Sequence, residues 1–284
     1  MGDLRHLQKF LSCPLCYSDL ELNGTGTEYR CKGCGERYHI EMGIPIMLPS
    51  SAEITDKSFV KFVESLGSME RYRSSSKWIW EEESDTIKKY INFDGKVVFD
   101  AGCGCGYITS MMNLMEKCEK TFLIDLSLSQ LIAFRQNNAI DDAENIFLIC
   151  GDIETSILNY NIDILICTHV LEHLLRPDKA LATFNKLLTS DGVLYASVPI
   201  LNFPLFRNII ILLFRKFRGS GYNDHLRVYS TKSLITDLNA AGFVVDKIIY
   251  HSMYRSPFSN GGTLNRWISW LLAKGVTVIC SKRK

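Results

Sequence analysis

Three aspartates that each follow an apolar run have the clearest potential for chemistry: Asp100, Asp125 and Asp152. Asp100 is followed by glycine at every second position from 102 to 106, and then by helix-forming residues. This pattern predicts a strand, a tight turn and a helix whose free N–H groups face a ligand. Such turns serve several ligands, and a turn without a ligand stays open as an alternative. A P-loop is excluded because no Gly-Lys-Ser/Thr follows.

Asp100 also indicates the charge of the ligand. A carboxylate two residues before the first glycine would repel a pyrophosphate, but it suits a ligand that carries an ammonium group. S-adenosylmethionine carries one, beside a carboxylate, a sulfonium and an adenosine. Residues 97–109 resemble the first motif of class I S-adenosylmethionine-dependent methyltransferases, an apolar strand followed by Asp/Glu-x-Gly-x-Gly-x-Gly. The cofactor-binding residues expected here are Asp100, Gly102, Cys103 and Gly104.

The other two acids extend the same expected site. Asp125 lies about 20 residues beyond the glycines, a distance at which an acid can reach ribose hydroxyls, and Leu126 follows it. The resemblance implies that Asp152 hydrogen-bonds the adenine amine and that Ile153 packs on the ring. Each acid alone is more often a helix cap or a surface residue. Together, at neighbouring ends of parallel strands, the three predict one ligand crevice.

A fourth expected strand ends at Thr168, which joins the cofactor-binding set, and leads into residues 169–174, His-Val-Leu-Glu-His-Leu. The Leu-Glu-His segment resembles the fourth motif of quinone-, lipid- and small-molecule methyltransferases. It does not resemble the Asn/Asp-Pro-Pro-Tyr motif of enzymes that methylate exocyclic or amide nitrogens. The segment from His225 to Thr231 is similar to small-molecule and glycan methyltransferases. These resemblances weigh against methylation of a nucleic-acid base.

Methyl transfer to an oxygen needs a base, and histidine suits that role near neutral pH. The catalytic candidates are, in this order, His225, His169 and His173. The alternatives are packing or capping roles for His169 and His173, and substrate binding without catalysis for His225.

Two Cys-x-x-Cys pairs near the N-terminus predict one tetrahedral Zn²⁺ with four thiolate ligands: Cys13, Cys16, Cys31 and Cys34. A closed set of four ligands leaves no open position, so the expected role is structural or in recognition. A redox pair and four unligated cysteines are the alternatives. The segment resembles the zinc-ribbon proteins that partner tRNA and release-factor methyltransferases. It also resembles the ribbon of 23S rRNA guanine-N1 methyltransferases, where one ligand is histidine.

The amino-acid composition narrows the classes of protein and of binding partner that remain. The 284 residues carry a net charge of +1, which predicts neither strong nucleic-acid binding nor an acidic partner. The apolar share of 46% supports a packed core. No apolar run approaches the ~20 residues that span a bilayer, and Met1–Leu11 lacks the apolar stretch of a signal peptide. Cysteines in expected strands indicate reduced thiols and a cytoplasmic location.

The alternation of strands and helices predicts an α/β fold, a doubly wound, mostly parallel sheet, with seven strands by the class I resemblance. The expected units are a zinc ribbon (1–50), a helical connector (51–95) and a methyltransferase domain (96–284) with insertions around 203–222 and 252–275. In the connector, Tyr72 or Trp78 either packs against the next domain or covers the cofactor. Residues 203–218 predict a basic, apolar helix: a lid or core helix, or one that contacts lipid at a membrane surface.

We therefore expect a methyltransferase that uses S-adenosylmethionine and one structural Zn²⁺. The expected acceptor is a small molecule, a lipid-linked compound or a glycan, methylated at oxygen. Two alternatives stay open: an RNA methyltransferase that grips nucleic acid through the ribbon, and a non-catalytic protein that binds S-adenosylmethionine as a scaffold.

Overall fold

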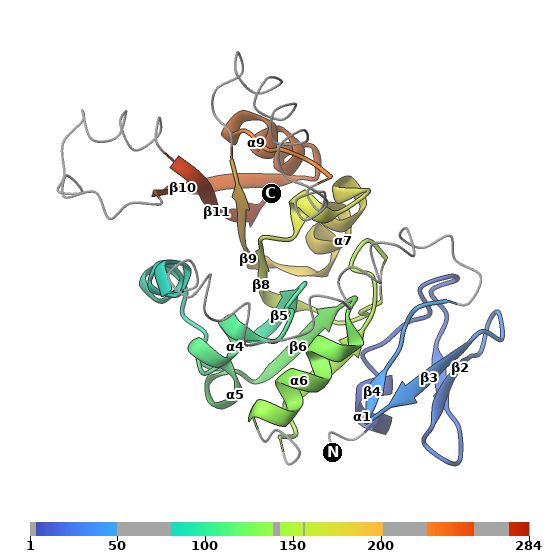
Figure 1. Ribbon diagram of the computed structural model, residues 1–284. Coiled ribbons are helices and arrows are strands. Elements are labelled where there is room, and N and C mark those ends of the chain that lie inside the picture. Colours follow the sequence, from blue (N-terminus) through green and yellow to red (C-terminus); the bar gives the residue numbers. More distant parts are fainter. Residues whose placement is uncertain are drawn as a thin grey trace, which may run out of the picture.

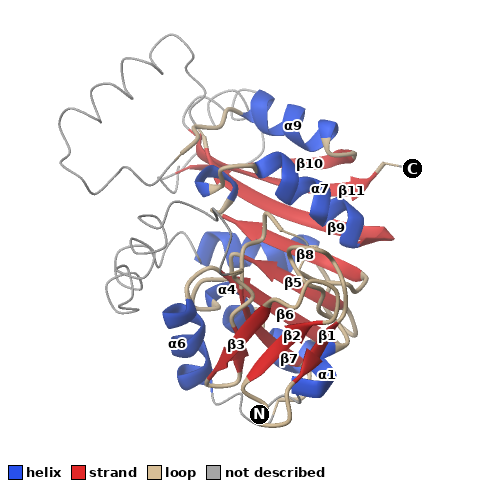
Figure 2. Ribbon diagram, turned by 90° about the vertical axis from the view of Figure 1, so that its right-hand side faces the viewer, coloured by secondary structure: helices blue, strands red, loops and turns tan. Residues whose placement is uncertain are grey.

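The computed structural model describes residues 4–49, 81–138, 143–155, 157–200, 226–252 and 273–283. Within these residues the chain forms a small antiparallel sheet near the N-terminus and a large sheet covered by helices on both faces (Figure 1). The strands of the small sheet lie at one end of the large one (Figure 2).

The large sheet has seven strands in the order β10-β11-β9-β8-β5-β6-β7. Strands β5 to β9 run parallel, and β11 pairs antiparallel with both β9 and β10. The expected doubly wound, mostly parallel sheet is therefore confirmed, and the order of strands reverses between β5 and β8, where such folds bind ligands. The strands are β5 (Val97–Ala101), β6 (Lys120–Asp125), β7 (Ile146–Cys150), β8 (Ile162–Thr168), β9 (Leu188–Pro199), β10 (Phe243–Ser252) and β11 (Ala273–Lys282).

Apolar side chains on the two faces of the sheet hold the helices in place. One face packs against the helical residues 81–90, α4 (Tyr107–Met111), α5 (Leu114–Lys117) and α6 (Leu128–Asn138). The other face packs against α7 (Pro177–Leu187) and α9 (Thr231–Ala240). Burial on both faces explains why the central strands read as continuous apolar runs.

Local signals set several of the helix and strand bounds. Pro177 occupies the first turn of α7, and the Ser230 hydroxyl caps α9 by accepting from the Ser233 N–H. Strand β9 begins at Leu188. Its pairing with β8 passes directly from Leu188 to Val193, so Asp191 and Gly192 lie inside the strand as an irregularity.

The N-terminal unit contains α1 (Leu4–Gln8) and four strands in chain order: β1 (Leu20–Leu22), β2 (Glu28–Cys31), β3 (Arg37–Glu41) and β4 (Ile44–Pro45). All neighbouring strands pair antiparallel.

This unit continues the large sheet at its β7 edge. Ile46 forms a parallel bridge with Cys150, and the Met47 N–H donates to the Cys150 carbonyl at 2.6 Å. The Ser12 N–H donates to the Ile157 carbonyl at 2.8 Å. The Phe10 ring contacts the rings of Phe122, Phe147 and Tyr160 in the large sheet and its loops, so the two units share one apolar core.

Several sequence interpretations concern residues outside the described ranges. These residues are Tyr72 and Trp78 in the connector, residues 203–218, residues 253–272 of the second insertion, and His225. Among the described helices, none combines the length and apolarity needed to cross a bilayer.

Candidate active site

The turn after β5 adopts a conformation that requires glycine. Gly102, Gly104 and Gly106 have φ angles of 72°, 54° and 66°, in the left-handed region. A Cβ on Gly102 would lie 2.4 Å from a Val170 methyl group, and one on Gly106 would lie 2.2 Å from the Phe134 ring. The turn thus approaches its surroundings closely on two sides. The Gly104 N–H donates to Asp125 Oδ2 at 2.7 Å, which joins the turn to the end of β6.

The structure brings the three acids to one edge of the sheet, each buried near a strand end. Asp100 Oδ2 accepts from the Thr109 hydroxyl at 2.7 Å, and Asp125 Oδ1 accepts from the Ser127 N–H at 2.8 Å. Asp152 Oδ1 accepts from the Glu154 N–H at 2.8 Å. Each acid therefore also orders its own turn. The remaining predicted residues of this crevice lie at the same edge: Leu126, Ile153 and Thr168.

Burial makes this crevice favourable for a cation. Burial raises the pKa of Asp100 to about 7, with the Thr109 hydrogen bond opposing the shift and the charge of Asp125 adding to it. Burial also raises the pKa of Asp152, although the Glu154 N–H opposes the shift. The charge of Glu154 adds to the Asp152 shift and the charge of Arg176 opposes it. Buried carboxylates hold protons more tightly than exposed ones. A bound ammonium group would offset this cost.

The end of β8 carries a second group of ionisable side chains. His169 has a φ angle of 55° and its N–H donates to the Ser197 carbonyl at 2.9 Å. The following turn, η2 (Leu171–His173), places Glu172 Oε1 3.9 Å from His169 Nδ1 and 3.8 Å from His173 Nε2. Two imidazoles therefore flank one carboxylate.

The Glu172 side chain is 1% exposed, and its Oε2 accepts no hydrogen bond from the described residues. Burial raises the pKa of Glu172 to about 8 and lowers the pKa of His169. His169 is thus favoured in its neutral, proton-accepting form. Both histidines are candidate bases expected from the sequence, and Glu172 is a further residue that the His-x-x-Glu-His spacing signals.

A third polar group, also unpredicted, lies between the helical residues 81–90 and β9 to β11. Buried Glu83 accepts hydrogen bonds through Oε1 from Tyr195 at 2.7 Å and Thr277 at 3.2 Å. His251 bonds Thr277 at 2.6 Å and pairs with Glu82 at 3.3 Å. Burial lowers the pKa of His251, but the hydrogen bond with Glu82 and the charge of Glu83 raise it overall. This network attaches the helix to the strands that neighbour His169.

The four cysteine sulfur atoms lie within 4.8 Å of one another. Cys13 Sγ is 3.7 Å from Cys34 Sγ, and Cys16 Sγ is 3.3 Å from Cys31 Sγ. Tetrahedral Zn²⁺ with Zn–S bonds of ~2.3 Å places its sulfur ligands roughly 3.8 Å apart. The separations therefore fit one zinc ion.

Two of these thiols have shifted pKa values. Hydrogen bonds from Ser18 lower the pKa of Cys16 to about 6. The Glu36 backbone lowers the pKa of Cys34, but partial desolvation and the neighbouring thiols outweigh it and raise that pKa to about 12. A bound Zn²⁺ favours the thiolate form of its cysteine ligands.

The strand order, the glycine turn and the acids at the carboxyl edge define a class I S-adenosylmethionine-dependent methyltransferase, here with a four-cysteine zinc ribbon. A family model described as "Methyltransferase domain" matches residues 73–248, more than half of the chain. The chain therefore belongs to this methyltransferase family, and S-adenosylmethionine is its cofactor.

The curated relative described next matches only part of this chain. A ubiquinone biosynthesis O-methyltransferase from Coxiella burnetii is 30% identical over 126 residues, which are 44% of this chain and 53% of that protein. The chain thus spans about half the length of this curated relative.

Solved structures share the fold at low identity. A complex between the Haloferax volcanii Trm112 methyltransferase activator and a methyltransferase matches with a TM-score of 0.59 and 14% identity, covering 78% of this chain and 98% of that one. Magnesium protoporphyrin IX methyltransferase from Synechocystis, solved with S-adenosylhomocysteine, matches with a TM-score of 0.52 and 15% identity, covering 81% and 89%.

Proposed function

We propose that this enzyme transfers a methyl group from S-adenosylmethionine to an oxygen of a small-molecule, lipid-linked or glycan acceptor. The observation that carries the proposal is the pair of histidines around buried Glu172 at the end of β8. This group lies next to the glycine turn, because Val170 packs where a Gly102 side chain would be. A methyl donor at the turn and a base at His169 would therefore be neighbours.

The residues that would hold the cofactor follow from the crevice. Asp100 would face the ammonium group, with Gly102, Cys103 and Gly104 allowing close approach of the backbone. Asp125 would bind the ribose hydroxyls beside Leu126, and Asp152 would bind the adenine amine beside Ile153. Thr168 lies where β8 meets the crevice. When bound, S-adenosylmethionine supplies the methyl group as an electrophile on its sulfonium.

The chain's own contribution is to position the acceptor and accept its proton. His169 would accept the hydroxyl proton as the acceptor oxygen takes up the methyl group. Burial keeps that imidazole neutral and able to accept the proton. The Glu172 carboxyl group, 3.9 Å away, would stabilise the imidazolium in its ionised form, which predominates only above its pKa of about 8. His173 would share this carboxylate, and His225 remains a candidate base outside the described residues.

Two observations support this choice of acceptor. The Coxiella relative is named for methyl transfer to oxygen, although it matches over only part of its length. The end of the ribbon packs against β7. This packing supports a structural role for the ribbon, in preference to the nucleic-acid-binding role of the RNA alternative.

The test is incubation of the protein with methyl-labelled S-adenosylmethionine and fractionated cell extract. We expect label in a small-molecule, lipid or glycan fraction, bound through an oxygen, and none with Asp100→Ala. Label confined to RNA would favour the nucleic-acid alternative. Binding of S-adenosylhomocysteine without transfer to any fraction would favour the scaffold alternative.

A further inference from the structure

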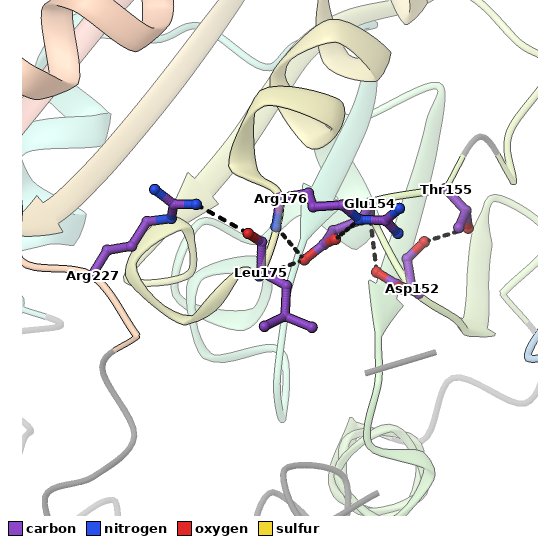
Figure 3. A network of polar contacts seen from close by, with 6 residues as sticks. All are labelled: Asp152, Glu154, Thr155, Leu175, Arg176 and Arg227. Atoms are coloured by element: carbon purple, nitrogen blue, oxygen red, sulfur yellow. Dashed lines mark hydrogen bonds and ion pairs between the residues drawn. The ribbon is translucent and has the colours of Figure 1, made fainter. Parts of the chain in front are cut away.

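Glu154 joins the loop after β7 to the segment after η2. Its side chain is only 3% exposed. Oε1 accepts from the Leu175 N–H at 2.7 Å and from the Arg176 N–H at 3.1 Å, and Oε2 accepts from Arg176 Nε at 3.0 Å. Figure 3 shows this carboxylate between the two segments. One side chain thus accepts three hydrogen bonds from residues more than 20 positions away.

The same loop carries Asp152. The Glu154 N–H donates to Asp152 Oδ1 at 2.8 Å, and the Thr155 hydroxyl donates to the Asp152 carbonyl at 2.7 Å (Figure 3). These bonds close a tight turn in which the Asp152 and Glu154 side chains are held together. A ligand that fixes the position of Asp152 would therefore also fix the position of Glu154.

The segment that Glu154 holds is also attached on its other side. The Arg227 N–H donates to the Glu172 carbonyl at 3.0 Å, and Arg227 Nη2 donates to the Leu175 carbonyl at 3.0 Å. Leu175 thus donates its N–H toward Glu154 and accepts from Arg227 through its carbonyl. Residues 171–176, which include Glu172 and His173, are held between the Asp152 loop and the chain around Arg227.

We propose that Glu154 is a positioning residue that couples cofactor binding at the Asp152 loop to the order of residues 171–176. The coupling rests on the proposed function, in which Asp152 contacts the adenine. Cofactor binding favours the ordered turn, the ordered turn places the Glu154 carboxylate, and that carboxylate fixes the amides of Leu175 and Arg176. Bound cofactor would then hold residues 171–176, which include Glu172 and His173, in the arrangement that these hydrogen bonds define. Glu154 touches no reacting atom in this scheme.

Two amides report the coupling directly, because Leu175 and Arg176 donate their N–H groups to Glu154. We expect S-adenosylhomocysteine to slow hydrogen exchange at both amides by roughly tenfold or more in the wild type. In Glu154→Gln, which keeps the shape and removes the charge, the ligand should slow them by less than about twofold. Calorimetry should show that the variant still binds the ligand, with Kd raised by less than about tenfold, because the other cofactor contacts remain.

If Glu154 had only a structural role, Glu154→Gln would speed hydrogen exchange at both amides, with and without the ligand. The ratio of the exchange rate without ligand to the rate with ligand would then stay as in the wild type. Glu144→Gln is the matched control, since Glu144 is exposed in the connection between β6 and β7. Arg176→Gln is the second variant, because it removes only the Nε bond and keeps both amide donors, so it should lower the ratio partially.

An equal ligand-dependent slowing of both amides in wild type and Glu154→Gln would overturn the coupling. Failure of the wild type to bind S-adenosylhomocysteine in calorimetry would instead refute the cofactor site, and the coupling with it. The two failures are therefore separated by the binding measurement.

Discussion

The Gly104 N–H donates a hydrogen bond to Asp125 Oδ2 at 2.7 Å, and this contact joins the glycine turn after β5 to the acid that ends β6. The Gly102 N–H adds a backbone bond to the Ile124 carbonyl at 2.8 Å. The turn and the acid are therefore positioned together. Asp125 would present its carboxylate to the ribose from a position that the glycine turn already sets.

Asp125→Ala should weaken binding of S-adenosylhomocysteine by about tenfold or more, because it removes both the proposed ribose contact and the acceptor for Gly104. Isothermal titration calorimetry measures the change. Asp94→Asn, at an exposed site before β5, is the control and should bind normally. Normal affinity of Asp125→Ala would remove this residue from the site.

Cofactor binding should weaken as the pH falls below about 7, because Asp100 has a pKa raised to about 7 in the ligand-free protein. An ammonium group favours the carboxylate, so binding at low pH must release a proton from Asp100. Affinity should then fall by up to about tenfold per pH unit well below that pKa. Calorimetry in buffers of different ionisation enthalpy measures the released proton.

Asp100→Asn should bind weakly at every pH and release no proton at this position. A wild-type affinity that is constant between pH 6 and pH 8 would contradict the proposed contact with the ammonium group.

Glu172 should make the ligand-free protein less stable as the pH rises. Its pKa is raised from the ordinary 4.5 to about 8, so the folded state binds more protons than the unfolded state between these values. Stability therefore falls across this window, by on the order of a few kcal/mol, and the contribution is constant above it. Glu172→Gln should lack this decline in urea unfolding at pH 5, 7 and 9.

The same variant should lose most methyl transfer above about pH 8, where the ionised Glu172 of the wild type would stabilise the His169 imidazolium. A neutral amide that supported wild-type turnover would show that Glu172 has only a packing role. Parallel pH slopes of stability in the two proteins would contradict the raised pKa.

Removal of zinc should unfold the ribbon and destabilise the edge of the large sheet. We expect about one zinc ion per chain by metal analysis, and its loss with Cys13→Ser or with a chelator. Because Met47 bonds the Cys150 carbonyl, just before Asp152, affinity for S-adenosylhomocysteine should also fall. Unchanged thermal unfolding after complete removal of the metal would show that the four thiols need no cation.

The sequence predicted those parts of the structure that depend on local pattern. The three acids lie at one edge, as expected, because parallel strands align their carboxyl ends. The contacts of Glu83 with Tyr195 and Thr277 join residues 112 and 194 positions apart, and no periodicity encodes such pairs. The contact of Glu154 with Leu175 is likewise tertiary.

The docking of the ribbon on β7 is also a tertiary contact that no local pattern predicts. Residues 44–47 read as a short apolar strand, and their partner at Cys150 is fixed only when the two units pack. Glu172 differs from these cases, because its position between two histidines is a local signal that could have been used.

Ile46 of the ribbon and Cys150 of the large sheet belong to one polypeptide, and this linkage sets the effective concentration of the ribbon at the sheet. Two separate proteins would have to find each other, and their complex would dissociate on dilution. A tether keeps the ribbon at an effective concentration on the order of millimolar, so the pairing needs little intrinsic affinity and does not depend on how much protein is made. Each catalytic unit therefore always has its own ribbon, in a fixed one-to-one ratio, and competing proteins have little opportunity to displace it.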